Sequence, residues 1–128
     1  MPGRRQEGMT GRETEIMHVI WSLGEGTVED IRDRLSEDLA NSTVRTLLSI
    51  MEDKGYVGFH KAGKAKVFRA LIPREEAQAS ALRNLTHRLF QESADQLVAR
   101  LVEDEQLSLE ELDRLRRSLR RRQKEKRK

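Results

Sequence analysis

Residues 41–71 read NSTVRTLLSIMEDKGYVGFHKAGKAKVFRAL, a helical pattern that runs directly into a hairpin pattern. Asn41 or Ser42 can cap the start of the helix, because their short polar side chains accept hydrogen bonds from free backbone N–H groups. Gly55 ends the helix, since glycine readily takes the left-handed conformation that follows many helices. The apolar residues recur at three- and four-residue steps, which predicts one buried face: Val44, Leu47, Leu48 and Met51.

Two helices are predicted before residue 41. Thr10 and Glu13 fit a capping box, in which each side chain binds the other residue's backbone N–H, so a first helix begins there and runs to about Leu23. A Gly-Glu-Gly break follows. Thr27 then caps a second helix with acids in its first turn, where the helix dipole favours them.

Two strands are predicted after the third helix, at residues 56–61 and 65–71, around a short turn at residues 62–64. Three helices followed by one hairpin, all within residues 9–74, is the layout of a winged helix-turn-helix DNA-binding domain. We therefore expect a mostly α chain of the α+β class, whose first domain is this winged helix.

The chain changes character after Pro73. Apolar residues at helical spacing predict one long helix over residues 75–103, kinked or broken near residues 91–93, and Ser108 opens a capping box for a last helix. We expect residues 75–122 to form a two-helix dimerisation arm, the alternative being that these helices pack back on the first domain. The expected contact residues are Leu82, Leu85, Leu89, Phe90, Leu97, Val98, Leu101, Val102, Leu109, Leu112, Leu115 and Leu119.

The composition excludes several classes of protein. Of the 128 residues 37% are charged and none is cysteine, which suits a small head with amphipathic appendages and excludes disulfides and thiolate metal sites. No apolar run approaches the roughly 20 residues that span a bilayer. Residues 1–8 are polar and lack a signal-peptide core, so we expect a flexible N-terminus, a cytoplasmic location and no membrane insertion.

The net charge of +3 hides strong segregation. Residues 54–74 carry six bases and no acid, residues 92–113 carry eight acids and one base, and residues 116–128 carry nine bases and one acid. Two concentrated basic regions are typical of a nucleic-acid footprint. For residues 123–128 taken alone, we expect a frayed, solvated basic tail.

The third helix of a helix-turn-helix domain lies in the major groove, where residues near its start meet base edges. Its outward residues here are hydroxyls and one arginine, and its first acids, Glu52 and Asp53, come only in the final turns. Basic residues of the hairpin and the first helix would bind the sugar-phosphate backbone. The expected recognition set is Ser42, Thr43, Arg45, Thr46 and Ser49, and the expected backbone set is Arg12, His60, Lys61, Lys64 and Lys66.

No pattern in the chain indicates catalysis. The three histidines, His18, His60 and His87, fall on separate predicted elements without metal-ligand spacing. No nucleophile has a recognisable histidine and acid partner, and no glycine-rich loop opens a helix. We expect neither an enzyme nor a bound metal or cofactor.

Three motifs together are specific: ETEIMHVIW at residues 13–21, STVRTLL at 42–48 followed by KGYV at 54–57, and EQLS at 105–108. With them the chain resembles, from about residue 11 to residue 119, the penicillinase and methicillin-resistance repressor family, which also includes copper-responsive repressors. The first motif is similar to that family's opening E-x-x-V/I-M-x-x-I/L-W helix.

The resemblance implies a homodimeric transcriptional repressor that covers a double-stranded DNA operator of dyad symmetry. The residues that it implies for reading the operator are those of the recognition set without Ser49. Members that respond to β-lactams are inactivated after a membrane sensor's metalloprotease signal leads to cleavage in the dimerisation helix, which aligns here with Arg100 and Leu101. Family members carry Asn-Phe at that bond, so this sequence departs from the pattern. The copper-responsive branch uses a C-terminal cysteine pair that this chain lacks, so copper sensing is not expected.

Two other functions fit the residues taken alone. A winged helix can serve as a protein-interaction module, in which the same helices and hairpin bind another protein. The basic C-terminal region could instead make the chain a non-specific DNA-binding protein.

Overall fold

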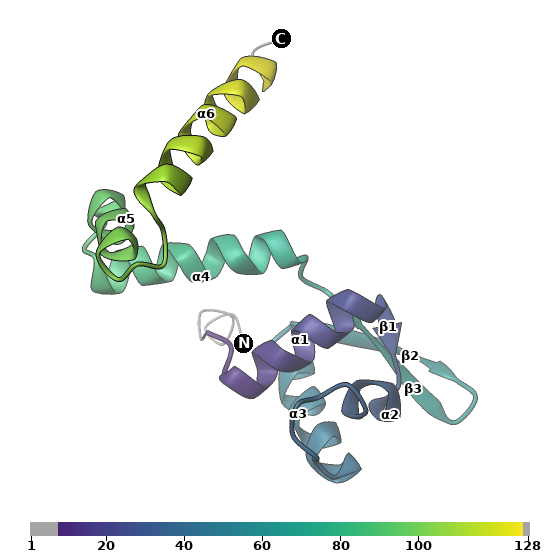
Figure 1. Ribbon diagram of the computed structural model, residues 1–128. Coiled ribbons are helices and arrows are strands. Elements are labelled where there is room, and N and C mark those ends of the chain that lie inside the picture. The colour runs from purple at the N-terminus through teal and green to yellow at the C-terminus, as the bar shows by residue number, and fades with distance from the viewer. Residues whose placement is uncertain (1–7, 127–128) are drawn as a thin grey trace. The chain divides into compact units, whose positions relative to one another are not determined.

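The computed structural model describes residues 8–126 and divides into two compact units, Met1–Ala81 and Leu82–Lys128 (Figure 1). The sequence places the domain boundary at residue 74. The structure divides later, after Ala81, which lies inside a helix. Residues 1–7 of the expected flexible N-terminus lie outside the described residues.

The first unit has the element order that the sequence predicts, three helices and then a hairpin, with one further strand. The elements are α1 (Gly11–Leu23), β1 (Glu25–Gly26), α2 (Val28–Arg32), α3 (Asn41–Asp53), β2 (Val57–Ala62) and β3 (Ala65–Ala70). The expected α+β winged helix is therefore confirmed. Both hairpin strands lie within a residue or so of their predicted bounds.

The three strands form one antiparallel sheet in the order β1-β3-β2. The sequence did not indicate β1, because its two residues coincide with the glycine-rich break after α1. Gly26 pairs with Phe68 of β3. A Cβ atom at Gly26 would lie 3.2 Å from both Leu23 Cδ1 and Asp30 Cβ, so these two side chains would have to move by a few tenths of an ångström to admit a larger residue.

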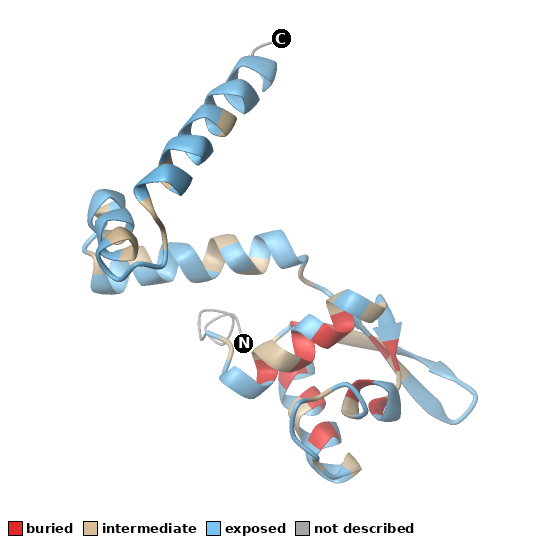
Figure 2. Cartoon of the chain, viewed as in Figure 1, coloured by how far each residue is buried: buried red, intermediate tan, exposed pale blue. Residues whose placement is uncertain are grey.

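One hydrophobic core holds the first unit together, and every buried hydrophobic residue in the described part of the chain belongs to it (Figure 2). Of the face predicted for α3, three residues are buried and Leu47 is half-buried. Trp21 donates from Nε1 to the carbonyl of Ile72 at 2.9 Å, which attaches the segment after the sheet to α1. The core residues are Ile16, Met17, Val19, Ile20, Val28, Ile31, Val44, Leu48, Met51, Tyr56, Val57 and Phe68.

The helix starts follow the predicted capping patterns with one exception. Thr10 and Glu13 form the expected capping box at α1. At α3 the prediction was wrong, because the N-cap residue is Ala40 and no side chain caps it. Asn41 is already helical, and its side-chain oxygen accepts a hydrogen bond from Arg32 Nη1 at 2.6 Å. That contact links the end of α2 to the start of α3.

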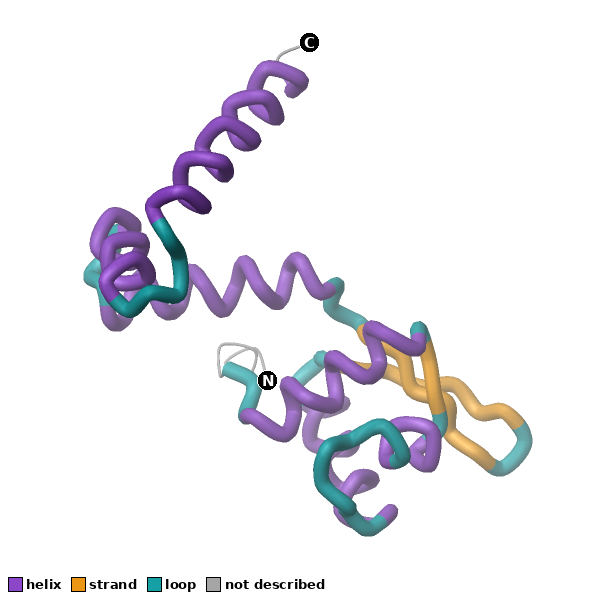
Figure 3. The backbone as a smooth tube through the Cα atoms, viewed as in Figure 1, coloured by secondary structure: helices purple, strands orange, loops and turns teal. Residues whose placement is uncertain are grey.

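The arm consists of three helices, not the two that were expected: α4 (Arg74–Leu89), α5 (Ala94–Glu103) and α6 (Leu109–Lys126) (Figure 3). The predicted long helix is interrupted after Leu89, where Gln91 and Glu92 take positive φ angles of 48° and 71°. Ser108 and Glu111 form the expected capping box at α6, with both hydrogen bonds at 3.0 Å.

Helix α6 also corrects the expected frayed tail, because residues 123–126 are helical and only residues 127–128 lie outside the described part. None of α4, α5 and α6 contains a buried residue. No described helix is both long and apolar enough to cross a bilayer.

Candidate nucleic-acid interface

Helix α3 turns one face into the core and exposes the other. Each member of the expected recognition set is exposed, as the periodicity predicts. The hydroxyl of Thr46 donates to the carbonyl oxygen of Ser42 at 3.0 Å, so its hydrogen is used within the helix and its methyl group remains for apolar contact.

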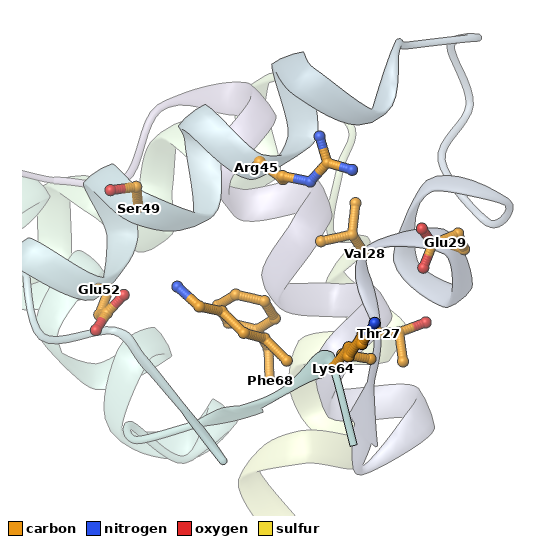
Figure 4. Close-up of a pocket in the computed structure, with 10 residues that line it drawn as sticks. Thr27, Val28, Glu29, Arg45, Ser49, Glu52, Lys64 and Phe68 are labelled. Atoms are coloured by element: carbon orange, nitrogen blue, oxygen red, sulfur yellow. The ribbon is translucent and has the colours of Figure 1, made fainter. Parts of the chain in front are cut away.

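A groove of about 480 Å³ runs between α3, the start of α2 and the hairpin (Figure 4). Helix α3 contributes Arg45 and Ser49, which lie four residues apart and so on one side of the helix. The hairpin contributes Lys64 and Lys66. Part of the recognition set and part of the backbone set therefore lie around one concave surface.

Other members of the two sets lie elsewhere. Ser42, Thr43 and Thr46 are exposed but do not line the groove. Arg12, expected to contact the DNA backbone, forms an ion pair with Glu37 at 2.9 Å. That contact holds the Arg12 guanidinium against the connection between α2 and α3, which contains Glu37.

The hairpin has two faces, because side chains alternate along its strands. Lys61 lies directly opposite Lys66 in the strand register, next to the facing pair Phe59 and Phe68. Lys66 Nζ lies 4.3 Å from the centroid of the Phe59 ring. Because like charges directly opposite each other repel, this lysine pair favours a bound anion.

His60 belongs to the other face of the hairpin. It alternates with Lys61 along β2, and its Nδ1 lies 3.9 Å from Glu25 Oε2 of β1. The sequence grouped His60 with the three hairpin lysines, but the register separates it from Lys61 and Lys66.

Two acids outside the expected recognition and backbone sets also line the groove, Glu29 and Glu52. Glu52 lies seven residues after Arg45, so helical periodicity alone could have placed it on the same side. Glu29 comes from the first turn of α2, and no local pattern relates it to α3. The groove is therefore a mixed surface with a small excess of positive charge.

Lys54 is withdrawn from the basic surface. Its Nζ lies 3.1 Å from both carboxylate oxygens of Glu13, and the two side chains are 13% and 3% exposed. The pair joins the start of α1 to the end of α3. The sequence offered no signal for it, because the partners are 41 residues apart.

Within the described residues no cluster of histidine and carboxylate side chains could hold a metal ion. The site is thus an exposed helix, a hairpin with opposed lysines, and the groove between them.

Comparison with known proteins gives a consistent assignment. A model of the penicillinase repressor family matches residues 9–121. The methicillin resistance regulatory protein MecI of Staphylococcus aureus strain N315 is 24% identical over 110 residues, which are 84% of this chain and 89% of that protein. The penicillinase repressor of Bacillus licheniformis is 27% identical over 105 residues, 80% of this chain and 82% of that one.

Two further matches are an uncharacterised protein and a solved structure. A 16.5 kDa protein from the ptsI 3′ region of Latilactobacillus sakei is 31% identical over 102 residues, 78% of this chain and 70% of that protein. A CopR repressor structure is 32% identical with a TM-score of 0.44, and the match covers 52% of this chain and 99% of that chain. The family match, which extends from before α1 into α6, shows that the chain belongs to the penicillinase repressor family of transcriptional repressors, which are not enzymes.

Proposed function

We propose that this transcriptional repressor acts as a homodimer, in which each copy presents α3 to one half-site of an inverted-repeat operator. Repression then follows from occupancy, because the bound dimer blocks access to the promoter. Two recognition helices held about 34 Å apart, or a multiple of that, would match half-sites on one side of the duplex.

The groove between α3 and the hairpin is the observation on which this proposal rests. It combines one guanidinium on α3, which can bind guanine bidentately, with two hairpin lysines, which suit phosphate. Ser42, Thr43 and Thr46 extend the reading surface along the exposed side of α3. Glu29 and Glu52 restrict non-specific attraction, since carboxylates beside the duplex repel phosphate.

Dimerisation is supported by the apolar surface of the arm. Eleven of the twelve expected contact residues lie in α4, α5 and α6, and Phe90 directly follows α4. None of the twelve is buried within one chain. Leu82, Leu89 and Leu109 are 53%, 74% and 67% exposed. A second copy would cover such side chains, and joining two heads raises operator affinity through effective concentration.

Relief of repression by proteolysis belongs to the same proposal. The bond between Arg100 and Leu101 lies in the last turn of α5, and the Arg100 carbonyl accepts a hydrogen bond from Asp104 N–H at 2.9 Å. This turn must unwind before a protease can bind it. The protease proposed as the switching partner, a membrane sensor-transducer metalloprotease or one that it triggers, follows from the resemblance to repressors that respond to β-lactams. Mass spectrometry of the chain from induced cells would identify a fragment that ends at Arg100.

The recognition surface is tested with the double variant Arg45→Ala/Thr46→Ala. We expect the preference for operator over random duplex to fall about 10- to 100-fold, because base contacts are lost while phosphate contacts remain. Footprinting on the upstream region of its own gene identifies the operator, and fluorescence anisotropy measures both affinities.

The matched control is Thr14→Ala/Arg34→Ala, at positions outside the proposed DNA-contact and dimer-contact residues. It removes the same residue types, and Thr14 also donates to a carbonyl four residues earlier, at 2.9 Å. An unchanged preference in the α3 variant would overturn the assignment of α3. A wild-type chain that ignores promoter DNA in low salt would overturn the function itself.

A further inference from the structure

Helix α6 carries an arginine cluster that the proposed function does not use. Arg114, Arg117, Arg120 and Arg121 line one open hollow on its surface. No carboxylate lies within 4.0 Å of any of the four in the described part of the chain. We call these four residues the arginine face.

The arginine face is directed away from the apolar stripe of the same helix. At 3.6 residues per turn, Arg117 and Arg121 lie about 160° around the axis from Leu115 and Leu119. A dimer that covers the leucines would therefore leave the arginines exposed. Self-association through the stripe does not explain the cluster.

Helix electrostatics do not explain it either. Cations stabilise the C-terminal end of a helix through the dipole, but the effect is confined to the last turn. In α6 that turn holds Lys124 and Lys126, whereas Arg114 and Arg117 lie two turns or more before it. Arg114 interacts with the Glu111 carboxylate, whose pKa its charge helps to lower. The mutual repulsion of Arg117, Arg120 and Arg121 would be relieved by an external anion.

We propose that the arginine face binds the phosphate backbone of double-stranded DNA without reading its bases, as a contact separate from the α3 groove. Guanidinium groups bind phosphate bidentately, which distinguishes them from the point charge of lysine. Arg114 to Arg121 spans about 10 Å along the helix, long enough to contact more than one phosphate of a strand. A duplex is favoured over an acidic protein segment because the chain is a repressor with a second cationic surface at the α3 groove.

The experiment compares two double variants of the full-length chain that remove the same charge from the same helix. Arg117→Gln/Arg121→Gln alters the arginine face, and Arg116→Gln/Arg122→Gln removes two arginines that flank the leucine stripe. Fluorescence anisotropy with a random duplex, repeated over a range of salt concentrations, gives the slope of log K against log salt.

We expect the first variant to reduce the magnitude of that slope by about 1.8 for each chain that contacts the duplex, and so by about 3.6 for a homodimer, since each lost phosphate contact contributes about 0.9. The second variant should change the slope by less than half as much. Arg117→Lys/Arg121→Lys should retain most of the slope, because the charges are kept. The operator preference should be the same in all variants, which separates this contact from base reading by α3.

Three results would overturn the proposal. Equal losses in the two glutamine variants would show that only the net charge of the chain matters. An unchanged slope in the arginine-face variant would show that these residues do not contact the duplex. Competition by poly-glutamate as strong as that by random DNA of equal charge would indicate an acidic protein as the partner.

Discussion

At the scale of single residues, the ion pair of Glu13 and Lys54 fixes where α3 lies. Glu13 accepts hydrogen bonds from Lys54 Nζ and from the Thr10 backbone N–H, so one carboxylate serves both the capping box of α1 and the end of α3. Burial strengthens the attraction, but it also makes either partner costly to leave alone. The pair therefore positions α3 through α1.

Lys54→Met should lower the free energy of unfolding by about 3 kcal/mol, because it leaves the Glu13 carboxylate buried without its partner charge. Urea unfolding at a fixed protein concentration measures the change. Lys61→Met, on the exposed part of the hairpin, serves as the control and should stay within about 0.5 kcal/mol of wild type. A Lys54 variant as stable as this control would show that the pair does not hold the two helices together.

At the scale of elements, three carboxylates at or near helix starts are stabilised in the charged form. The Ser36 backbone N–H lowers the pKa of Glu15, that of Thr27 lowers the pKa of Asp30, and that of Ser108 lowers the pKa of Glu111. Because these pKa values are lower in the folded chain, the three charged carboxylates stabilise the fold at every pH above the ordinary carboxyl range near pH 4. This stabilisation is lost as the pH falls through the lowered pKa values.

Ser108→Ala should raise the pKa of Glu111 toward its ordinary value, since both the capping hydroxyl and the fixed loop geometry are lost. As the pH is lowered, the start of α6 should also unwind earlier, that is, at a higher pH than in wild type. NMR titration of the Glu111 carboxyl carbon measures the first effect. Ser118→Ala, in the middle of α6, is the control. Identical Glu111 titrations in the two variants would contradict a role for Ser108.

Elements with a local signal could be predicted, and elements that depend on distant partners could not. The capping box of Thr10 and the buried face of α3 need only neighbouring residues, and both predictions are confirmed. Strand β1 exists because Gly26 reaches Phe68 across the sheet. Asn41 looks like an N-cap until Arg32 is brought within 2.6 Å of it.

The candidate interface follows the same division. The exposed residues of α3 could be predicted, because periodicity separates its outer face from its core face. The separation of His60 from Lys61 follows from strand alternation, which is a local signal in the sequence. The entry of Glu29 into the groove depends on how α2 packs beside α3, which no local pattern shows.

At the scale of the whole molecule, the two units bury apolar surface differently. The first has a closed core, whereas the second has leucine-rich helices without a buried residue. Exposed leucine surface of this extent is costly in water, and a matching surface on a second copy would remove the cost for both chains. A switch that separates the arms would then release DNA without altering the reading surface.

Leu85→Asp should therefore convert the proposed dimer to monomers and weaken operator binding, because a charge replaces a side chain that the second copy would cover. Leu85 is 39% exposed within one chain, so the substitution should leave the first unit folded.

The control is Asn84→Asp, which adds the same carboxylate one position earlier on another side of α4. Sedimentation equilibrium measures the assembly, and anisotropy with the operator should show a loss of at least tenfold for the leucine variant, since each head then binds without its linked partner. A dimer that survives Leu85→Asp, and also Leu82→Asp/Leu85→Asp, would exclude this face of α4 from the interface and assign dimerisation to α5 and α6 alone.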